Sequence, residues 1–274
     1  MHTMSNSASS GGGAVQTSDG VRIHYRIVGT GPRTVLFLHG WAGSGSGTFW
    51  NLVMEQLGLE NVRLVLPDLR GHAHSEHASE GFRTERFGED MFNLADHLGV
   101  TELILVAYSM SGRWAQWMAC TRPERVIGQV LIGPAPATPM PLSHELVDDW
   151  LRSVRTQEGF RALERGFAKR PLPDDVLGDC FDAVRNTPEH TLRETLRMCT
   201  EPSFTHKLSN TRAATVVVGG IHDPLMPPAY LREEVVRHIP GARLALLDCG
   251  HSMPLEAPLE TAAILEAFLA PLVL

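Results

Sequence analysis

Short aliphatic runs alternate with segments of helical periodicity along most of this chain, and this alternation constrains its fold more than any other feature. A run of about four to eight apolar residues between turn residues is typical of a strand buried on both faces, whereas apolar residues recurring every three to four positions indicate an amphipathic helix. We expect strands at residues 34–38, 62–66, 103–107, 126–132, 215–220 and 243–247, with helices near 49–57, 82–98, 111–121, 230–238 and 258–268. This alternation predicts an α/β fold built on a doubly wound, mostly parallel sheet.

The start of the chain follows a different pattern. Residues 21–27 alternate apolar and polar side chains, as a half-exposed antiparallel strand does, and we expect 14–17 to pair with them across Ser18-Asp19-Gly20. These two strands bring the predicted sheet to eight strands. Residues 1–13 are rich in serine and glycine, and we expect a disordered tail there.

A long interval without strand signals follows the proline-rich segment that begins at Gly133. Apolar residues recur at helical spacing through this interval, which predicts four short amphipathic helices. An insertion at the edge where parallel strands end is well placed to cover a ligand site. We therefore interpret 136–205 as a helical cap, with 14–135 and 206–274 forming the core.

The composition limits the classes of partner. With 274 residues, 43% of them hydrophobic, the chain can bury a substantial core. A net charge of -7 and the absence of a basic stripe argue against nucleic acids and anionic membranes as partners. No apolar run approaches the roughly 20 residues that span a bilayer, and the N-terminus lacks the apolar core of a signal peptide. We expect a cytoplasmic protein that acts on a small molecule; the sequence makes no prediction of its oligomeric state.

The four cysteines give no sign of a shared site. They are scattered and form no Cys-x-x-Cys pair, so neither a zinc site nor a disulfide framework is indicated. They are Cys120, Cys180, Cys199 and Cys249.

The predicted strand 103–107 stops abruptly before Ser109, and a helix is predicted from 111 onward. A strand that turns into a helix so sharply strains the residue at the turn and requires small neighbours, a demand that Ala107 and Ser111 meet. Such a turn exposes the serine hydroxyl and leaves the next N–H, that of Met110, at a helix N-terminus. Taken alone, a serine after an apolar run is usually a helix cap.

A second register is also conceivable, with Ser111 as the nucleophile. It would place Arg113 at one of the crowded positions, where an arginine is far harder to accommodate than a serine. We therefore prefer Ser109.

Two further polar residues follow predicted strands directly. Asp223 comes after the strand that ends near residue 219, and His251 comes after the strand that ends at 247. Because the carboxyl ends of parallel strands meet at one sheet edge, we expect both side chains near Ser109. A serine nucleophile needs a general base and usually a carboxylate that orients the base. Asp248 and Glu256 are rival candidates for that carboxylate.

Five motifs in this order and spacing resemble those of the α/β-hydrolase fold superfamily, over essentially the whole chain from about residue 15. They are Leu38-His39-Gly40-Trp41, the stretch 68–75 (Asp-Leu-Arg-Gly-His-Ala-His-Ser), the turn at Ser109, Gly220-Ile221-His222-Asp223-Pro224 and the stretch 250–258. The chain departs from the family pattern at Ala73, Ala107 and Ser111, where glycine is commoner.

The resemblance implies a role for each candidate residue. Ser109 would be the nucleophile, His251 the base and Asp223 the orienting acid, while the backbone N–H groups of Trp41 and Met110 would form an oxyanion hole. No cofactor is implied. A metal site at His72, His74 and His77 is the weaker interpretation, because these residues fall where the family has a short polar loop.

The resemblance implies a serine hydrolase that cleaves an ester or lactone bond of a small apolar substrate through an acyl-enzyme. The same scaffold and triad also support cofactor-free perhydrolases and carbon–carbon bond hydrolases, and a rival outside enzymes is a slow-turnover ligand receptor. An apolar pocket is expected, to which we assign Trp41, Met110, Trp150, Leu225 and Met226; Phe160 is a further candidate from the cap.

Overall fold

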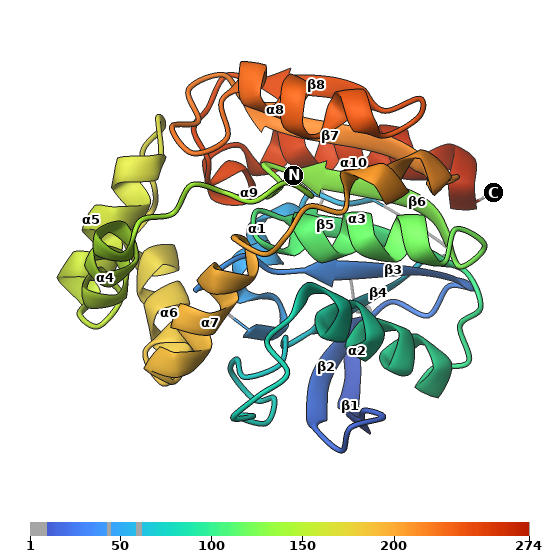
Figure 1. The fold of residues 1–274 in the computed structure, drawn as a ribbon, viewed down its shortest axis with the longest axis horizontal. Helices are drawn as coiled ribbons and strands as arrows, with labels where there is room; N and C mark the ends of the chain where they lie inside the picture. The colour runs from blue at the N-terminus through green and yellow to red at the C-terminus, as the bar shows by residue number, and fades with distance from the viewer. Residues whose placement is uncertain (1–9, 43–44, 59–61, 274) are drawn as a thin grey trace, which may run out of the picture.

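The computed structural model describes residues 10–42, 45–58 and 62–273 of the chain. Its framework is an eight-stranded sheet in the order β1-β2-β4-β3-β5-β6-β7-β8, with helices on both faces (Figure 1). From β4 to β8 all neighbouring strands are parallel. The predicted fold class, a mostly parallel eight-stranded α/β sheet, is therefore confirmed.

The two strands at the beginning of the sheet are antiparallel. β1 (Ser10–Gln16) pairs with β2 (Arg22–Val28) as a hairpin, and β2 pairs with β4 (Val62–Pro67). The predicted tail 1–13 was wrong at its end, because 10–13 pair with 25–28 in the hairpin. Its first nine residues lie outside the described part of the chain.

The parallel strands coincide closely with the apolar runs of the sequence. They are β3 (Arg33–Leu38), β5 (Leu103–Tyr108), β6 (Val126–Ile132), β7 (Ala214–Gly220) and β8 (Arg243–Leu247). The side chains of β5 are buried along its whole length, since helices cover both faces of the sheet there. Continuous apolar runs therefore mark the centre of the sheet.

Each face of the sheet has its own hydrophobic cluster. One cluster packs under α2 (Thr84–His97), α3 (Ser111–Thr121) and α8 (Pro228–Glu234), and the other under α1 (Asn51–Met54), α9 (Met253–Glu256) and α10 (Pro258–Val273). A 3₁₀ turn, η1 (Gly45–Trp50), precedes α1, so the helix expected at 49–57 is shorter than predicted. No helix in the described ranges is long and apolar enough to cross a lipid bilayer.

Four helices stand between β6 and β7, at the edge where the parallel strands end (Figure 1). They are α4 (His144–Ser153), α5 (Gln157–Phe167), α6 (Asp174–Val184) and α7 (Glu189–Met198). The hydroxyl oxygens of Ser143 and Thr156 accept backbone N–H groups and so cap α4 and α5 at their N-termini. We refer to 136–205 as the cap; its boundaries remain those predicted from sequence.

Arg113 on α3 ties both ends of the cap to the core. Its guanidinium is completely buried and donates to four backbone carbonyls and to one hydroxyl at 2.9–3.1 Å. The acceptors are Pro136 and Thr138 where the chain leaves the core, Glu201 and Pro202 where it returns, and Thr84 Oγ1. Only the forked geometry of arginine satisfies so many acceptors at once.

We expect Arg113→Lys to lower the free energy of unfolding by about 3 kcal/mol, because an ammonium group keeps the buried charge but reaches fewer carbonyls. Urea denaturation measures the loss, and limited proteolysis should show faster cleavage within 136–205. Arg152→Lys is the matched control, since the Arg152 side chain is 70% exposed and its replacement should change stability by less than about 0.5 kcal/mol. Equal stability of Arg113→Lys and the wild type would refute the claim that Arg113 ties the cap to the core.

Candidate active site

Ser109 lies at the turn between β5 and α3 in a left-handed conformation, with φ of 53°. A residue with a side chain rarely adopts this conformation, so the surroundings must hold it. Its N–H donates to the Ile132 carbonyl at 2.8 Å, and its own carbonyl accepts the Ala135 N–H at 2.8 Å. The chain on both sides of the end of β6 thus fixes the turn and leaves the side chain half-buried at the sheet edge.

Ser111 has a different place in the same turn. It is completely buried, and its Oγ lies 2.9 Å from the carbonyl oxygens of both Leu38 and Tyr108. The hydroxyl therefore links the ends of β3 and β5 within the sheet. A glycine could not make this link, which gives a physical reason for a serine here, and the geometry favours Ser109 as the exposed hydroxyl.

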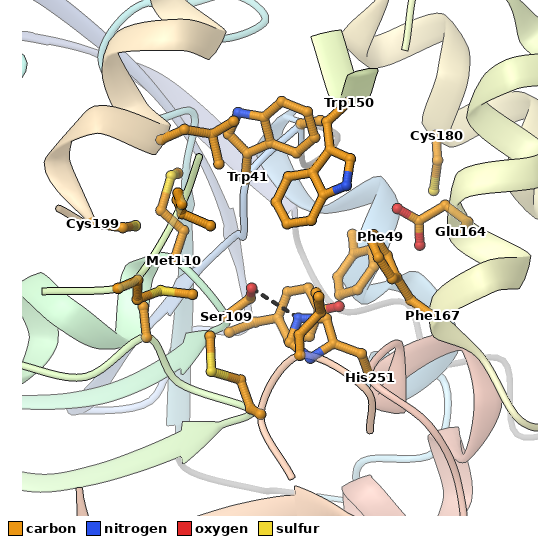
Figure 2. A pocket seen from close by; sticks show the side chains of 18 of the residues that line it. Trp41, Phe49, Ser109, Met110, Trp150, Glu164, Phe167, Cys180, Cys199 and His251 are labelled. Carbon is orange, nitrogen blue, oxygen red and sulfur yellow. Dashed lines mark hydrogen bonds between the residues drawn. The ribbon is translucent and has the colours of Figure 1, made fainter. Parts of the chain in front are cut away.

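The structure brings Ser109, His251 and Asp223 together in one hydrogen-bonded chain. Ser109 Oγ lies 2.9 Å from His251 Nε2 (Figure 2), and His251 Nδ1 lies 2.7 Å from Asp223 Oδ2. Because an ionised carboxylate only accepts hydrogen bonds, Nδ1 carries the proton and Nε2 accepts that of the serine. The other oxygen, Asp223 Oδ1, accepts the N–H groups of Leu225 and Met226 at 2.8 and 2.9 Å.

The protonation states of this pair support each other. Burial opposes ionisation of Asp223, but the charge and hydrogen bond of His251, with two backbone amides, lower its pKa. Burial also disfavours a charged His251, yet Asp223 outweighs this effect and raises the pKa of the imidazole, with smaller contributions from Glu164 and Glu256. The site therefore favours an ionised aspartate beside a histidine that readily takes up a proton.

The rival carboxylates have other partners. Asp248 is 76% exposed and contacts His222 Nε2 at 2.9 Å. Glu256 Oε2 accepts the backbone N–H groups of Gly250, Lys169 and Arg170 at 2.7–2.9 Å. Neither carboxylate is hydrogen-bonded to the His251 imidazole in the described part of the chain, so the geometry favours Asp223 as its partner.

The loop after β3 approaches Ser109 closely because of Gly40. A Cβ at position 40 would lie 2.8 Å from the Tyr108 ring and 3.2 Å from Ser109 Cβ. This approach brings the backbone of Trp41 beside the turn. Among the described residues, neither the Trp41 N–H nor the Met110 N–H has a hydrogen-bond partner, so both remain available as donors to a ligand oxygen.

An apolar pocket lies between Ser109 and the cap (Figure 2). The pocket is lined by all five residues that were assigned to it from the sequence, namely Trp41, Met110, Trp150, Leu225 and Met226. Phe160, the further candidate from the cap, lines it as well.

Sequence reasoning missed several lining residues, including Phe49, Tyr108, Glu164 and Phe167. The Trp150 ring contacts those of Trp41 and Phe167, with centroid distances of 5.7 and 5.5 Å, so the cap and the core share one aromatic wall. Glu164 could have been noticed, since it falls on the helix face that also carries Phe160 and Phe167. An acidic residue in an apolar stripe is a signal that needs no structure.

The structure does not bring the three candidate metal-binding histidines together. His72 is buried, and its Nδ1 contacts the Arg70 carbonyl, whereas His74 Nδ1 contacts Asp68 Oδ2 at 3.0 Å. His24 Nδ1 lies 3.2 Å from the same carboxylate oxygen, so His24, Asp68 and His74 offer three ligand atoms within 4.8 Å of one another. As they stand, these contacts tie the loop after β4 to β2.

The cap is also joined to the loop that carries His251. The His251 N–H donates to the Phe167 carbonyl at 2.8 Å, and Glu256 Oε2 accepts the N–H groups of Lys169 and Arg170 in the cap together with that of Gly250. A Cβ at Gly250 would lie 2.3 Å from the Phe167 carbonyl oxygen, so only glycine allows this contact. The position of His251 thus depends on the cap.

Comparisons with known proteins agree with the observed fold. A family model described as alpha/beta hydrolase fold matches residues 33–196. The chain is 27% identical over 247 residues to a non-heme haloperoxidase from Rhodococcus erythropolis, covering 84% of this chain and 89% of that protein. It is 28% identical over 255 residues to a 2-hydroxy-6-oxononadienedioate/2-hydroxy-6-oxononatrienedioate hydrolase from Pseudomonas putida, covering 86% and 89%. An esterase structure from Exiguobacterium antarcticum superposes with a TM-score of 0.85 at 19% identity, covering 95% of this chain and all of that one.

We expect Glu256→Ala to lower the free energy of unfolding by about 3 kcal/mol, since three backbone N–H groups lose their acceptor. Glu256→Gln should lower the free energy of unfolding by less, because its carboxamide oxygen still accepts hydrogen bonds. Glu260→Ala is the control: Glu260 is 42% exposed and pairs with Arg170 at the surface, so its loss should cost less than about 1 kcal/mol. Urea denaturation of the three variants tests this order, and a Glu256→Ala protein as stable as Glu260→Ala would contradict it.

Proposed function

Because this chain belongs to the alpha/beta hydrolase fold family, we propose that it is a serine hydrolase that cleaves an ester or lactone bond of a small, largely apolar substrate. The observation that carries the proposal is the unbroken chain of hydrogen bonds from Ser109 through His251 to Asp223. A hydroxyl, a base and a carboxylate in this geometry are what an acyl-transfer nucleophile requires.

In the first step the Ser109 hydroxyl attacks the substrate carbonyl and its proton passes to His251 Nε2. Asp223 keeps the proton on Nδ1 and stabilises the imidazolium that forms. The N–H groups of Trp41 and Met110 donate hydrogen bonds to the former carbonyl oxygen and stabilise its negative charge. Both are free of internal partners among the described residues, and the Met110 group stands just before α3, where the helix dipole favours negative charge.

In the second step the imidazolium returns its proton to the leaving alcohol, and the neutral His251 activates a water molecule. That water attacks the acyl-enzyme carbonyl, and Ser109 regains its proton as the acid departs. Every proton in this cycle moves through one imidazole nitrogen. The mechanism therefore needs no group beyond the side chains and amides described above.

The pocket disfavours an acyl group that carries a negative charge. Its walls are mostly aromatic and aliphatic, and no lysine or arginine is found among the described residues that line it. The Pseudomonas putida relative is named for a dienedioate, a dicarboxylate, for which these walls offer no cation. Ester or lactone cleavage is therefore the function that we favour over carbon–carbon bond cleavage of such a substrate.

Replacement of Ser109 tests the proposal directly. We expect Ser109→Ala to lower the turnover of p-nitrophenyl acetate or butyrate by a factor on the order of 10⁴ or more. Ser111→Ala should keep activity within about tenfold and lower the free energy of unfolding by about 1–2 kcal/mol, because its buried hydrogen bond is lost. An active Ser109→Ala enzyme beside an inactive Ser111→Ala enzyme would overturn the assignment.

The same assay separates the rival functions. Steady multiple turnover of esters or lactones would exclude a ligand receptor, whereas a shift in melting temperature without turnover would favour one. Halogenation that depends on hydrogen peroxide, measured beside ester cleavage, would identify a perhydrolase.

The raised pKa of His251 predicts the pH dependence of activity. A group that holds its proton more tightly supplies the neutral base only at higher pH, so kcat/KM should fall on acidification with a midpoint above 6.5, the ordinary value for histidine. Rates on an uncharged ester across the neutral range measure this midpoint. A midpoint below 6.5 would mean that burial, and not the neighbouring carboxylates, dominates at His251.

A further inference from the structure

Glu164 is an unexpected residue in this pocket. It lies on α5, one turn from the buried Phe160 and one turn from Phe167, and so belongs to the helix face that meets the pocket. Figure 2 shows its carboxyl group on the wall beside Cys180, opposite Met110 and Cys199. Glu164 is half-buried there, and a carboxylate among apolar side chains costs free energy unless its oxygens find donors.

The protein supplies few such donors. Ser252 Oγ donates to Glu164 Oε2 at 3.0 Å, and no other hydrogen bond to this carboxyl group is found within the described ranges. Burial raises the pKa of Glu164, although the Ser252 hydrogen bond and the charge of His251 oppose the rise. One oxygen of the pocket's acidic residue therefore lacks a donor from the chain, and a bound molecule could provide one.

The charges around the pocket determine which acyl chains Glu164 would favour. His251 and Glu164 are the two residues that carry or take up charge near neutral pH among the described lining residues, and His251 is occupied by Asp223 and Ser109. An acyl chain ending in a carboxylate would meet the ionised Glu164 as a like charge, with no lysine or arginine among the described lining residues to offset it. An acyl chain ending in a hydrogen-bond donor would meet an acceptor.

We propose that Glu164 makes the cap side of the pocket a subsite for an acyl chain that ends in a hydrogen-bond donor, most strongly an ammonium group, and that it excludes acyl chains ending in a carboxylate. This inference rests on the proposed function, because it assigns the acyl portion of the substrate to this wall. It makes Glu164 a specificity-determining residue. Serine at position 252 holds the carboxylate in place, and the substrate satisfies its second oxygen.

Binding measurements test the subsite without depending on hydrolysis. In the Ser109→Ala background, isothermal titration calorimetry would compare three sets of methyl esters: those of butanoic, pentanoic and hexanoic acid, of the matching ω-amino acids, and of the matching dicarboxylic acids esterified once. At the best chain length we expect the ω-amino ester to bind about a hundredfold more tightly than the carboxylate ester. Adding Glu164→Gln should reduce this ratio to within about tenfold, while affinity for the uncharged ester changes little.

Glutamine is the informative replacement because it keeps the shape of the side chain and can still accept the Ser252 hydrogen bond. Glu158→Gln is the matched control: Glu158 is exposed on the same helix, and its replacement should leave the ratio unchanged. Equal affinity for the two charged esters, or a ratio that Glu164→Gln does not alter, would overturn the proposal. Hydrolysis of the uncharged ester by the wild type bears on the proposed function alone, so the two failures are distinguishable.

Discussion

The left-handed backbone of Ser109 is the constraint on which the rest of the site depends. For a residue with a side chain this conformation costs about 1–3 kcal/mol, which the hydrogen bonds to Ile132 and Ala135 must offset. These partners belong to β6 and the segment after it, so the neighbouring strand fixes the turn. One backbone conformation thereby sets both the direction of the Ser109 hydroxyl and the position of the Met110 N–H.

The order of strands explains why the cap lies over this site. Ser109 follows β5, whereas Asp223 and His251 follow β7 and β8, and β6 lies between β5 and β7 in the sheet. The cap leaves the core at the end of β6 and returns to begin β7. An insertion at that point emerges between the nucleophile and its partners, so the connectivity itself places the cap over the hydrogen-bonded chain.

Much of the fold could be predicted because the information is local. Apolar runs of strand length and helical periodicity located the parallel strands and the cap helices, and the order of Ser109, Asp223 and His251 after their strands indicated that they meet.

Other features depend on contacts that the sequence does not show. The attachment of the cap to Arg113 could not be predicted, because the acceptors of this side chain are backbone carbonyls far along the chain. The pairing of β1 from Ser10 was missed because glycine and serine there resemble a flexible tail, while its partner strand supplies the order. The serine at 111 departed from the family pattern for a reason that only the two carbonyls beside it reveal.

The attachments of the cap govern how a molecule reaches Ser109. Arg113 holds both of its ends, Phe167 and the two residues of the cap bound by Glu256 hold its middle, and Trp41 Nε1 donates to the Leu192 carbonyl at 2.8 Å on α7. A cap fixed at three separate places cannot swing open as a rigid body without breaking buried hydrogen bonds. Rotations of the side chains that line the pocket, among them the Trp150 ring, break none of these hydrogen bonds and are far faster than domain motions. A molecule too wide to pass these side chains would therefore not reach Ser109, whatever its chemistry.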